Sequence, residues 1–277
     1  MTVFIINKNM MKKVLPVLIS LSFFYCSASI SKEIAWQLGA GIAEFNLNLY
    51  PGSTDTKNYI LPIPYFTLVS EKLEIGRGIR GFLFKSDDVV LDLSADFGIP
   101  VDSDDSGVRI GMPDLDAVLQ IGPSLEFLLT ELRRDQIDVR FELPLRAAIA
   151  SDIKHTSNEG WIMEPRFSIE KRRILKSGLA MKFTAGLKYA TQDFHAYYYD
   201  VDPGFSTATR PAYASEKGYG GSFAKIRASW REGDWIWWTL LRYQNLNGAV
   251  FEDSPLVEQK DYYLIGVGFA WIFAQNL

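Results

Sequence analysis

The chain is almost without cysteine and histidine, and beyond its N-terminal segment it has no long uninterrupted apolar run. Among 277 residues there are two histidines and a single cysteine, Cys26. Cys26 falls in a segment that is expected to be removed, so the mature chain is predicted to have no disulfide and no cysteine-ligated metal site. We expect no cofactor. A secreted chain of this kind must be held together in an oxidising compartment without covalent cross-links.

The N-terminus is organised as a secretory signal peptide. Three lysines precede the short apolar run Val14–Tyr25, and small residues follow it. A transmembrane helix needs roughly 20 apolar residues, which is more than this run provides. We therefore expect a signal peptide over residues 1–29 and a single β-barrel domain over residues 30–277.

Basic residues do not outnumber acidic residues in this chain. The full chain has 29 basic and 33 acidic residues, and the leader contains three lysines and no acid. The mature chain thus keeps 26 basic residues against 33 acidic ones, a composition that argues against nucleic acid as a partner. Hydrophobic residues nevertheless make up 48% of the sequence and aromatic residues 14%. They alternate with polar residues, which favours a β-barrel over membrane helices.

The last predicted strand, Tyr262–Phe273, shows this alternation most clearly. A period of two places one row of large apolar side chains and one row of mostly small side chains on opposite faces. The strand is long enough to cross a bilayer, which takes roughly 9–11 tilted residues. A lone strand cannot lie in lipid with unpaired backbone groups, so the rest of the chain is expected to close a barrel around it. The apolar row of this terminal assembly strand is Tyr263, Ile265, Val267, Phe269, Trp271 and Phe273.

Eleven strands can be identified along the chain, whereas bacterial single-chain barrels have even numbers. The pattern of Leu73–Phe84 is broken by three glycines. We expect this segment to supply two short strands, giving twelve in all; ten is the alternative if part of it lies outside the wall. The second strand, Ile60–Ser70, contains Pro62 and Pro64 and is predicted to be irregular or locally unpaired there, because proline lacks a backbone donor.

A soluble β-sandwich would also alternate, with its apolar face buried and its charged face in water. The predicted strands are longer than the 5–6 residues typical of globular sheets. Short turns also alternate with long loops, as in outer-membrane barrels. The predicted fold class is therefore all-β, a transmembrane antiparallel up-and-down β-barrel. The predicted short turns are Glu131–Gln136, Lys171–Gly178 and Arg231–Asp234, and the predicted long loops are Pro100–Pro113, Ala150–Gly160, Thr191–Gly220 and Asn245–Asp261.

The polar faces of these strands carry many charges, which are expected to line the lumen. Acidic residues gather in the earlier strands and basic residues in the later ones. They could line a narrow selective pore with a transverse field, or pair across the lumen and fill it, since open channels belong to barrels of about 16 strands. The lumen-lining charges are Asp92, Asp96, Glu126, Asp138, Arg140, Glu142, Arg146, Glu164, Arg166, Glu170, Lys182, Lys188, Lys225, Arg227 and Arg242.

The sequence contains few residues that could form a catalytic site. The two histidines, His155 and His195, lie near Asp152 and Asp193 in predicted outer loops, but no spacing typical of a hydrolase or a metalloprotease accompanies them. No catalytic or metal-binding residue is predicted. The loop Phe194–Tyr213 is rich in aromatic residues and could form a constriction in the barrel mouth, bind a ligand, or anchor at the membrane interface.

Five short segments, spread over most of the mature chain, add a family resemblance. No single segment identifies a family, but their order and spacing together are specific. They are Tyr50-Pro51-Gly52-Ser53, Leu61-Pro62-Ile63-Pro64, Gly111-Met112-Pro113-Asp114-Leu115-Asp116, Arg210-Pro211-Ala212-Tyr213 and Ser254-Pro255-Leu256-Val257.

With these segments the chain resembles the MipA/OmpV family of outer-membrane proteins. The resemblance implies an outer-membrane barrel in a Gram-negative bacterium, inserted by the barrel assembly machinery among lipid and lipopolysaccharide. It also implies a non-enzymatic scaffold that links a lytic transglycosylase to a penicillin-binding protein in peptidoglycan assembly. Other members look like porins, so a narrow channel for small solutes is the alternative. Members usually end at the terminal aromatic residue, whereas here Ala274–Leu277 follow Phe273.

Overall fold

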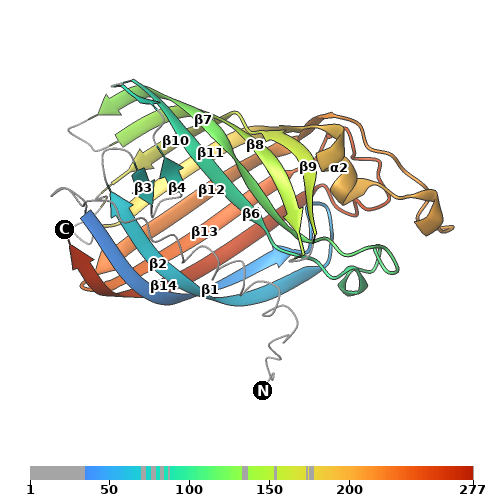
Figure 1. Cartoon of the computed structure of the whole chain (residues 1–277), viewed down its shortest axis with the longest axis horizontal. Helices are drawn as coiled ribbons and strands as arrows, with labels where there is room; N and C mark the ends of the chain where they lie inside the picture. Colours follow the sequence, from blue (N-terminus) through green and yellow to red (C-terminus); the bar gives the residue numbers. More distant parts are fainter. Residues whose placement is uncertain are drawn as a thin grey trace, which may run out of the picture.

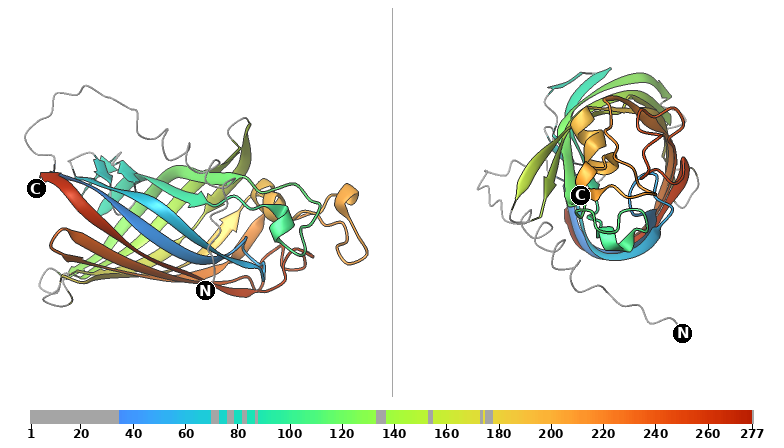
Figure 2. Two further views of the ribbon diagram at one scale, coloured as in Figure 1. Left: turned by 90° about the horizontal axis from the view of Figure 1, so that it is seen from below. Right: turned by 90° about the vertical axis from the view of Figure 1, so that its right-hand side faces the viewer.

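The computed structural model places the chain in a single antiparallel sheet that curls into a barrel (Figures 1 and 2). The predicted up-and-down β-barrel is confirmed. None of the helices in the described part of the chain is long and apolar enough to cross a bilayer. The predicted signal peptide and residues 133–136 of the first predicted turn lie outside the described residues. The structure describes residues 35–69, 73–75, 79–81, 84–86, 88–132, 137–152, 155–172, 174 and 178–276.

The described residues form fourteen strands, most of them long. The long strands are β1 (Ala35–Asn48), β2 (Thr56–Val69), β6 (Val89–Gly98), β7 (Ala117–Leu132), β8 (Ile137–Ser151), β11 (Ala180–Ala190), β12 (Gly218–Glu232), β13 (Trp235–Asn245) and β14 (Asp261–Asn276). The shorter ones are β3 (Leu73–Ile75), β4 (Ile79–Gly81), β5 (Phe84–Lys85), β9 (Thr156–Met163) and β10 (Arg166–Lys171). Three helical segments lie in the loops: η1 (Ser103–Asp105), α2 (Gln192–Tyr199) and η2 (Pro203–Phe205).

The hydrogen-bonded path through the described strands has thirteen positions. β9 and β10 share the position between β8 and β11. β4 and β5 follow each other closely in the chain and stand at the two ends of the path, and β4 also contacts β6. Between β2 and β6 the described residues thus form three short strands, where two were predicted, and the predicted total of twelve is reached when β4 and β5 are counted together.

The wall is closed by the two terminal strands. β1 pairs with β14 from Trp36 to Asn46, with one register shift after Leu38. β14 also continues past the predicted end at Phe273, and its residues 274–276 pair with residues 36–38. The residues that follow the terminal aromatic therefore belong to the barrel wall.

The outer face of the barrel is apolar. In β14 the side chains of Tyr263 and Phe273 are 58% and 51% exposed, and the intervening apolar row is similarly exposed except at Phe269. Phe269 packs instead against Trp235 and Trp237, with ring centroids 5.8 and 5.2 Å apart. The opposite row of β14 is mostly buried. An apolar surface of this extent is unusual in water and typical of the lipid-facing side of a membrane barrel.

Three details of the predicted strands are wrong. The predicted loop Ala150–Gly160 is mostly strand: β8 and β9 extend through it, and its polar residues still pair. The alternation of apolar and polar residues from Trp161 to Ile169 predicts a single strand, but the strand is interrupted between β9 and β10 at Pro165, which has no N–H to give to a ladder. Of the two alternatives for β2, the irregular strand is wrong, because Pro62 and Pro64 pair with β1 in unbroken register, whereas the local lack of pairing agrees with the other edge of the strand. Among the described residues the other edge of β2 pairs only at its last two residues, so the missing proline donors disrupt little.

The seam between β1 and β14 offers a test of closure. A side chain at Gly41 would contact the carbonyl oxygen of Phe269 and would place its Cβ 2.8 Å from that of Ala270. We expect the unboiled wild-type protein to migrate faster on a gel than the boiled protein, as a closed barrel does. Gly41→Val should abolish this difference by separating the two strands, whereas Ile42→Val, on the exposed outer face, should preserve it. Normal heat-modifiable migration of Gly41→Val would contradict the tight seam.

Candidate functional site

The predicted lumen charges lie inside the barrel. Thirteen of the fifteen line one of three internal cavities. The other two, Asp138 and Arg140, bond to each other at 2.8 Å, and Arg140 also lies 3.5 Å from Glu170. Arg172, just beyond the end of β10, bonds Asp138 at 2.7 Å and Glu170 at 3.3 Å. Arg172 is absent from the predicted lumen charges because it follows the last residue of the alternating pattern.

The interruption between β9 and β10 positions one carboxylate at the centre of the interior. Pro165 prevents a continuous ladder at this point, and the backbone N–H of Glu164 donates instead to the carbonyl of Pro144 on β8, at 3.2 Å. The side chain of Glu164 is only 4% exposed. The break at Pro165 and the bond to the carbonyl of Pro144 thus fix where this buried acid lies.

Glu164 is surrounded by four cations. Arg146 forms the closest ion pair with it, and Arg166 follows at 3.7 Å. Lys188 and Arg242 each lie 3.8 Å from its Oε1 atom. Arg146 also reaches Asp96 at 3.6 Å. Because a buried charge is costly without partners, this cluster holds strands from several sides of the barrel in one arrangement.

A second buried acid is satisfied differently. Glu142 is fully buried and accepts three bonds of 2.7 Å, from Arg166 Nε, Ser168 Oγ and Lys182 Nζ. Acidic and basic residues therefore alternate and pair within the interior. These contacts favour the paired interior over an acidic wall that faces a basic wall.

The three cavities follow one another inside the barrel. The first, about 190 Å³, lies beneath the loops, and the second, about 240 Å³, lies among the ion pairs. The third, about 650 Å³, lies near the ends of β12 and β13 that are joined by a short turn. Asp96 lines both the first and the second cavity, and Lys182 and Arg227 line both the second and the third. The ion pairs thus divide the interior into linked chambers.

The long loops form a cap over the barrel mouth. They gather at the end opposite to the C-terminus of β14, and the end-on view shows α2 within the outline of the barrel (Figure 2). The cap has its own apolar core, in which Tyr199 stacks on Phe251 at 3.7 Å with the rings nearly parallel. Phe194 packs into a second cluster with wall residues such as Val118 and Ile162. The aromatic loop therefore folds into the mouth.

Two arginines that the sequence reading did not single out tie the cap loops together. Arg109 is 3% exposed and donates to the carbonyls of Tyr198 and Pro113, at 3.2 and 3.0 Å. Its guanidinium also lies 5.6 Å from the ring centroid of Tyr50. The bond to Tyr198 joins segments that are distant in the sequence, so no local pattern could have revealed it.

Arg210, in the loop between α2 and β12, links that loop to the β6–β7 loop. It donates to the carbonyls of Val108, Ile110 and Phe205, at 2.7, 3.1 and 2.8 Å. The only available signal was its place in one of the segments that carry the family resemblance.

Four of those five segments meet in this cap. The hydroxyl of Tyr50 donates to the carbonyl of Leu256 at 2.8 Å. Ser254 donates to the carbonyl of Tyr199 at 2.7 Å. With the bonds of Arg109 to Pro113 and of Arg210 to the β6–β7 loop, segments separated by up to two hundred residues form one hydrogen-bonded structure.

The two histidines occupy different surroundings. His155 is exposed on the β8–β9 hairpin, with its Nδ1 3.7 Å from Asp152. His195 is fully buried in the cap, and its Nδ1 lies 2.7 Å from the carbonyl of Glu216. Burial lowers the pKa of His195 below its ordinary value, so the neutral ring donates from Nδ1 and leaves Nε2 as an acceptor. Within the described ranges no cluster of three or more His, Asp or Glu side chains could hold a metal ion.

Comparison with known proteins identifies a matching family. The family described as MltA-interacting protein MipA matches residues 38–273, which confirms the resemblance found in the sequence. No curated protein matches the chain. Among solved structures, the chain is similar to a Pseudomonas aeruginosa FadL homologue (7% identity, 88% of this chain and 91% of that chain, TM-score 0.31). It is also similar to the Ralstonia pickettii toluene transporter TbuX (10% identity, 88% and 90%, TM-score 0.31). These two likenesses are too slight to carry any inference about function.

The buried acid at the centre of the interior should be important for stability. Glu164→Gln leaves four neighbouring cations without their carboxylate, and we expect it to lower the free energy of unfolding by about 3–5 kcal/mol. Glu232→Gln, at an exposed position on β12, should change it by less than about 0.5 kcal/mol. Urea titration in detergent measures both. Equal stability of the two variants would show that the cluster contributes nothing net.

The cap should loosen when its arginine link is removed. Arg210→Gln loses bonds to three backbone carbonyls, at a cost of about 1–3 kcal/mol in local stability. We expect chymotrypsin to cleave the loop between α2 and β12 several-fold faster in this variant, while the wall strands stay protected. Lys217→Gln, at an exposed position in the same loop, is the matched control and should be cleaved at the wild-type rate. Unchanged cleavage of Arg210→Gln would mean that other contacts suffice to hold the cap.

Proposed function

The chain belongs to the MipA family, and on this premise we propose that it is a non-enzymatic outer-membrane scaffold that binds a lytic transglycosylase and links it to a murein synthase. The observation that carries the proposal is the family match over residues 38–273, since that family is described as MltA-interacting. The synthase of the proposed pair is a penicillin-binding protein.

The filled interior supports a scaffold over an open channel. Barrels of eight strands are filled by their own side chains, and aqueous channels belong to barrels of 16 or more. This barrel has a size between the two, with ion pairs around Glu142 and Glu164 across its middle. The cap then covers one end. A solute would have to disrupt paired charges to pass.

The geometry also limits where a partner can bind. Lipid covers the apolar side of the barrel, and the cap, next to lipopolysaccharide, occupies the outer end. The remaining surface is the rim with the short turns, which faces the periplasm in an outer-membrane barrel. Asp234, in the turn between β12 and β13, has a side chain that is 61% exposed on this rim. We place the docking surface for the transglycosylase here.

A narrow pore is a second candidate, and one observation favours it. The three internal cavities share lining residues in sequence, so they form a path from the periplasmic end to the underside of the cap. Movement of the cap would complete this path. The solute would be small, because the ion pairs leave little room in the middle chamber.

Binding and conductance can be measured on the same preparation. We expect the purified barrel, immobilised in detergent, to bind the lytic transglycosylase of its own organism saturably in biolayer interferometry, and to show no steady stepwise conductance in planar bilayers. Asp234→Arg should weaken binding by reversing a charge at the rim. Ile110→Asp, at a 58% exposed position on the cap, should leave it unchanged. Conductance steps without transglycosylase binding would reject the scaffold and support the pore.

A further inference from the structure

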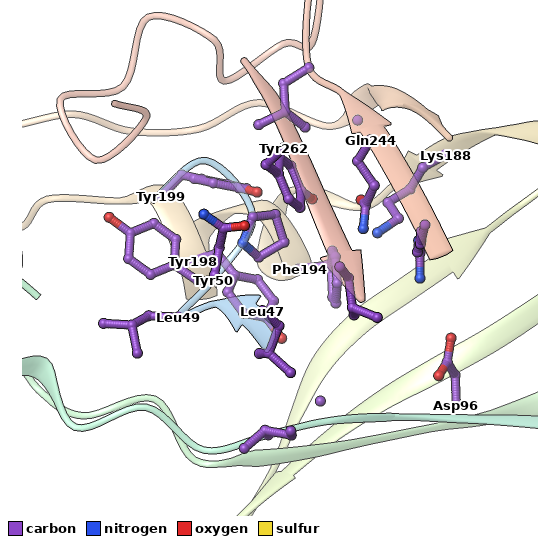
Figure 3. Close-up of a pocket in the computed structure, with 18 of the residues that line it drawn as sticks. Leu47, Leu49, Tyr50, Asp96, Lys188, Phe194, Tyr198, Tyr199, Gln244 and Tyr262 are labelled. Carbon is purple, nitrogen blue, oxygen red and sulfur yellow. The ribbon is translucent and has the colours of Figure 1, made fainter. Parts of the chain in front are cut away.

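The cavity beneath the cap has an apolar side and a polar side. Aromatic residues of α2, with Tyr50 and Leu49 from the β1–β2 turn, form the apolar side, and Lys188, Gln244 and Asp96 lie across from them (Figure 3). The space of about 190 Å³ suits a molecule of amino-acid size. Its polar side is the upper surface of the Glu164 cluster.

Several residues that line this cavity have a buried polar atom that has no partner among the described residues. These atoms are the hydroxyl of Tyr262, the Nε atom of Arg242 and the Nε2 atom of His195. Tyr262 is 6% exposed and His195 is fully buried. Buried polar groups in native proteins are almost always hydrogen-bonded, to protein, water or a ligand. Three unpartnered groups around one cavity therefore indicate an occupant.

The unpartnered groups define the chemistry of that occupant. Tyr262 and Arg242 offer an O–H and an N–H donor, so the occupant must supply acceptors to them. The Nε2 atom of His195 is itself an acceptor, and it needs an O–H or N–H donor from water or from another part of the occupant. Lys188 lies 3.8 Å from Glu164, too far for a close hydrogen bond, and its ammonium keeps donors available. A carboxylate is an acceptor-only group that can take two or more such bonds.

The local charge also favours an anion. Two carboxylates, Asp96 and Glu164, line the cavity, and both are already engaged by cations. Lys188 and Arg242 line the cavity opposite these two acids, and behind them Arg166 is shared with Glu142, which also binds Lys182. The whole group has five cations, Arg146, Arg166, Lys182, Lys188 and Arg242, against three acids, Asp96, Glu142 and Glu164. The surplus positive charge is buried, where a counter-charge is least screened by water.

We propose that the cavity beneath the cap is a binding site for a small organic anion. Its carboxylate lies against Lys188, Arg242 and Tyr262, and its apolar or aromatic body lies against Phe194 and Tyr198. The site is distinct from the periplasmic rim, so it can be present whether or not a transglycosylase binds there. The alternative occupant is ordered water, which would satisfy the same donors without selecting a ligand.

Three related probes separate these occupants in the wild-type barrel. Isothermal titration calorimetry in detergent is run with phenylacetate, with phenylacetamide, which keeps the ring but not the charge, and with acetate, which keeps the charge but not the ring. We expect phenylacetate to bind at least about tenfold more tightly than either of the others. Absence of phenylacetate binding at millimolar concentration, or equal binding of the amide, would overturn the proposal.

Two neighbouring tyrosines locate the site. Tyr262→Phe removes only a hydroxyl that has no partner, so the barrel should remain folded and heat-modifiable, while phenylacetate binding falls by about fivefold or more. Tyr263→Phe changes the next residue of β14, which is 58% exposed on the outer face, and should bind as the wild type does. Lys188→Gln should weaken phenylacetate more than phenylacetamide. Binding that is unaffected by both Tyr262→Phe and Lys188→Gln would place the ligand elsewhere and reject this site.

Discussion

The structure depends on the hydrogen bonds between its first and last strands. In lipid no water can satisfy a free N–H or C=O group, so a sheet that crosses the membrane must have no open edge. The pairing of β1 with β14 meets this requirement for the first and last strands, and it extends to Asn276, beyond the terminal aromatic residue. Once the sheet is closed, the side chain of every wall residue points either outward or inward. The alternating sequence then sends apolar side chains to lipid and charged ones to the interior.

This division places many charged side chains inside the barrel, where they need partners. A barrel of this size gives its charges little water, so each must find a partner or remain costly. Glu142 takes three bonds and Glu164 faces four cations, with Pro165 and Pro144 fixing the position of the latter acid. The cost of leaving any one of these groups unpaired holds the strands in a single register. The same pairing leaves the interior divided into chambers.

Much of the wall could be predicted from the sequence, because a period of two is a local signal. The rows of β14, the long wall strands and the inward charges all follow from it. The partners of those charges could not be predicted, since the approach of Glu164 to Arg242 depends on the curvature of the whole barrel. The interruption at Pro165 was missed because the alternation of faces continues across it. The cap was missed for another reason: Arg109 and Arg210 act through backbone carbonyls of distant loops, which no periodicity encodes.

The location of the resemblance segments bears on what the barrel does. Four of the five lie in the cap and form one bonded structure there, far from the rim with the short turns. A scaffold needs a rim that fits its partner, and nothing about docking requires a mouth closed by buried arginines. The closed mouth instead creates a chamber whose polar side is the charged cluster of the wall. The wall charges and the cap are therefore parts of one arrangement, in which the cap excludes water from the groups that the barrel has buried.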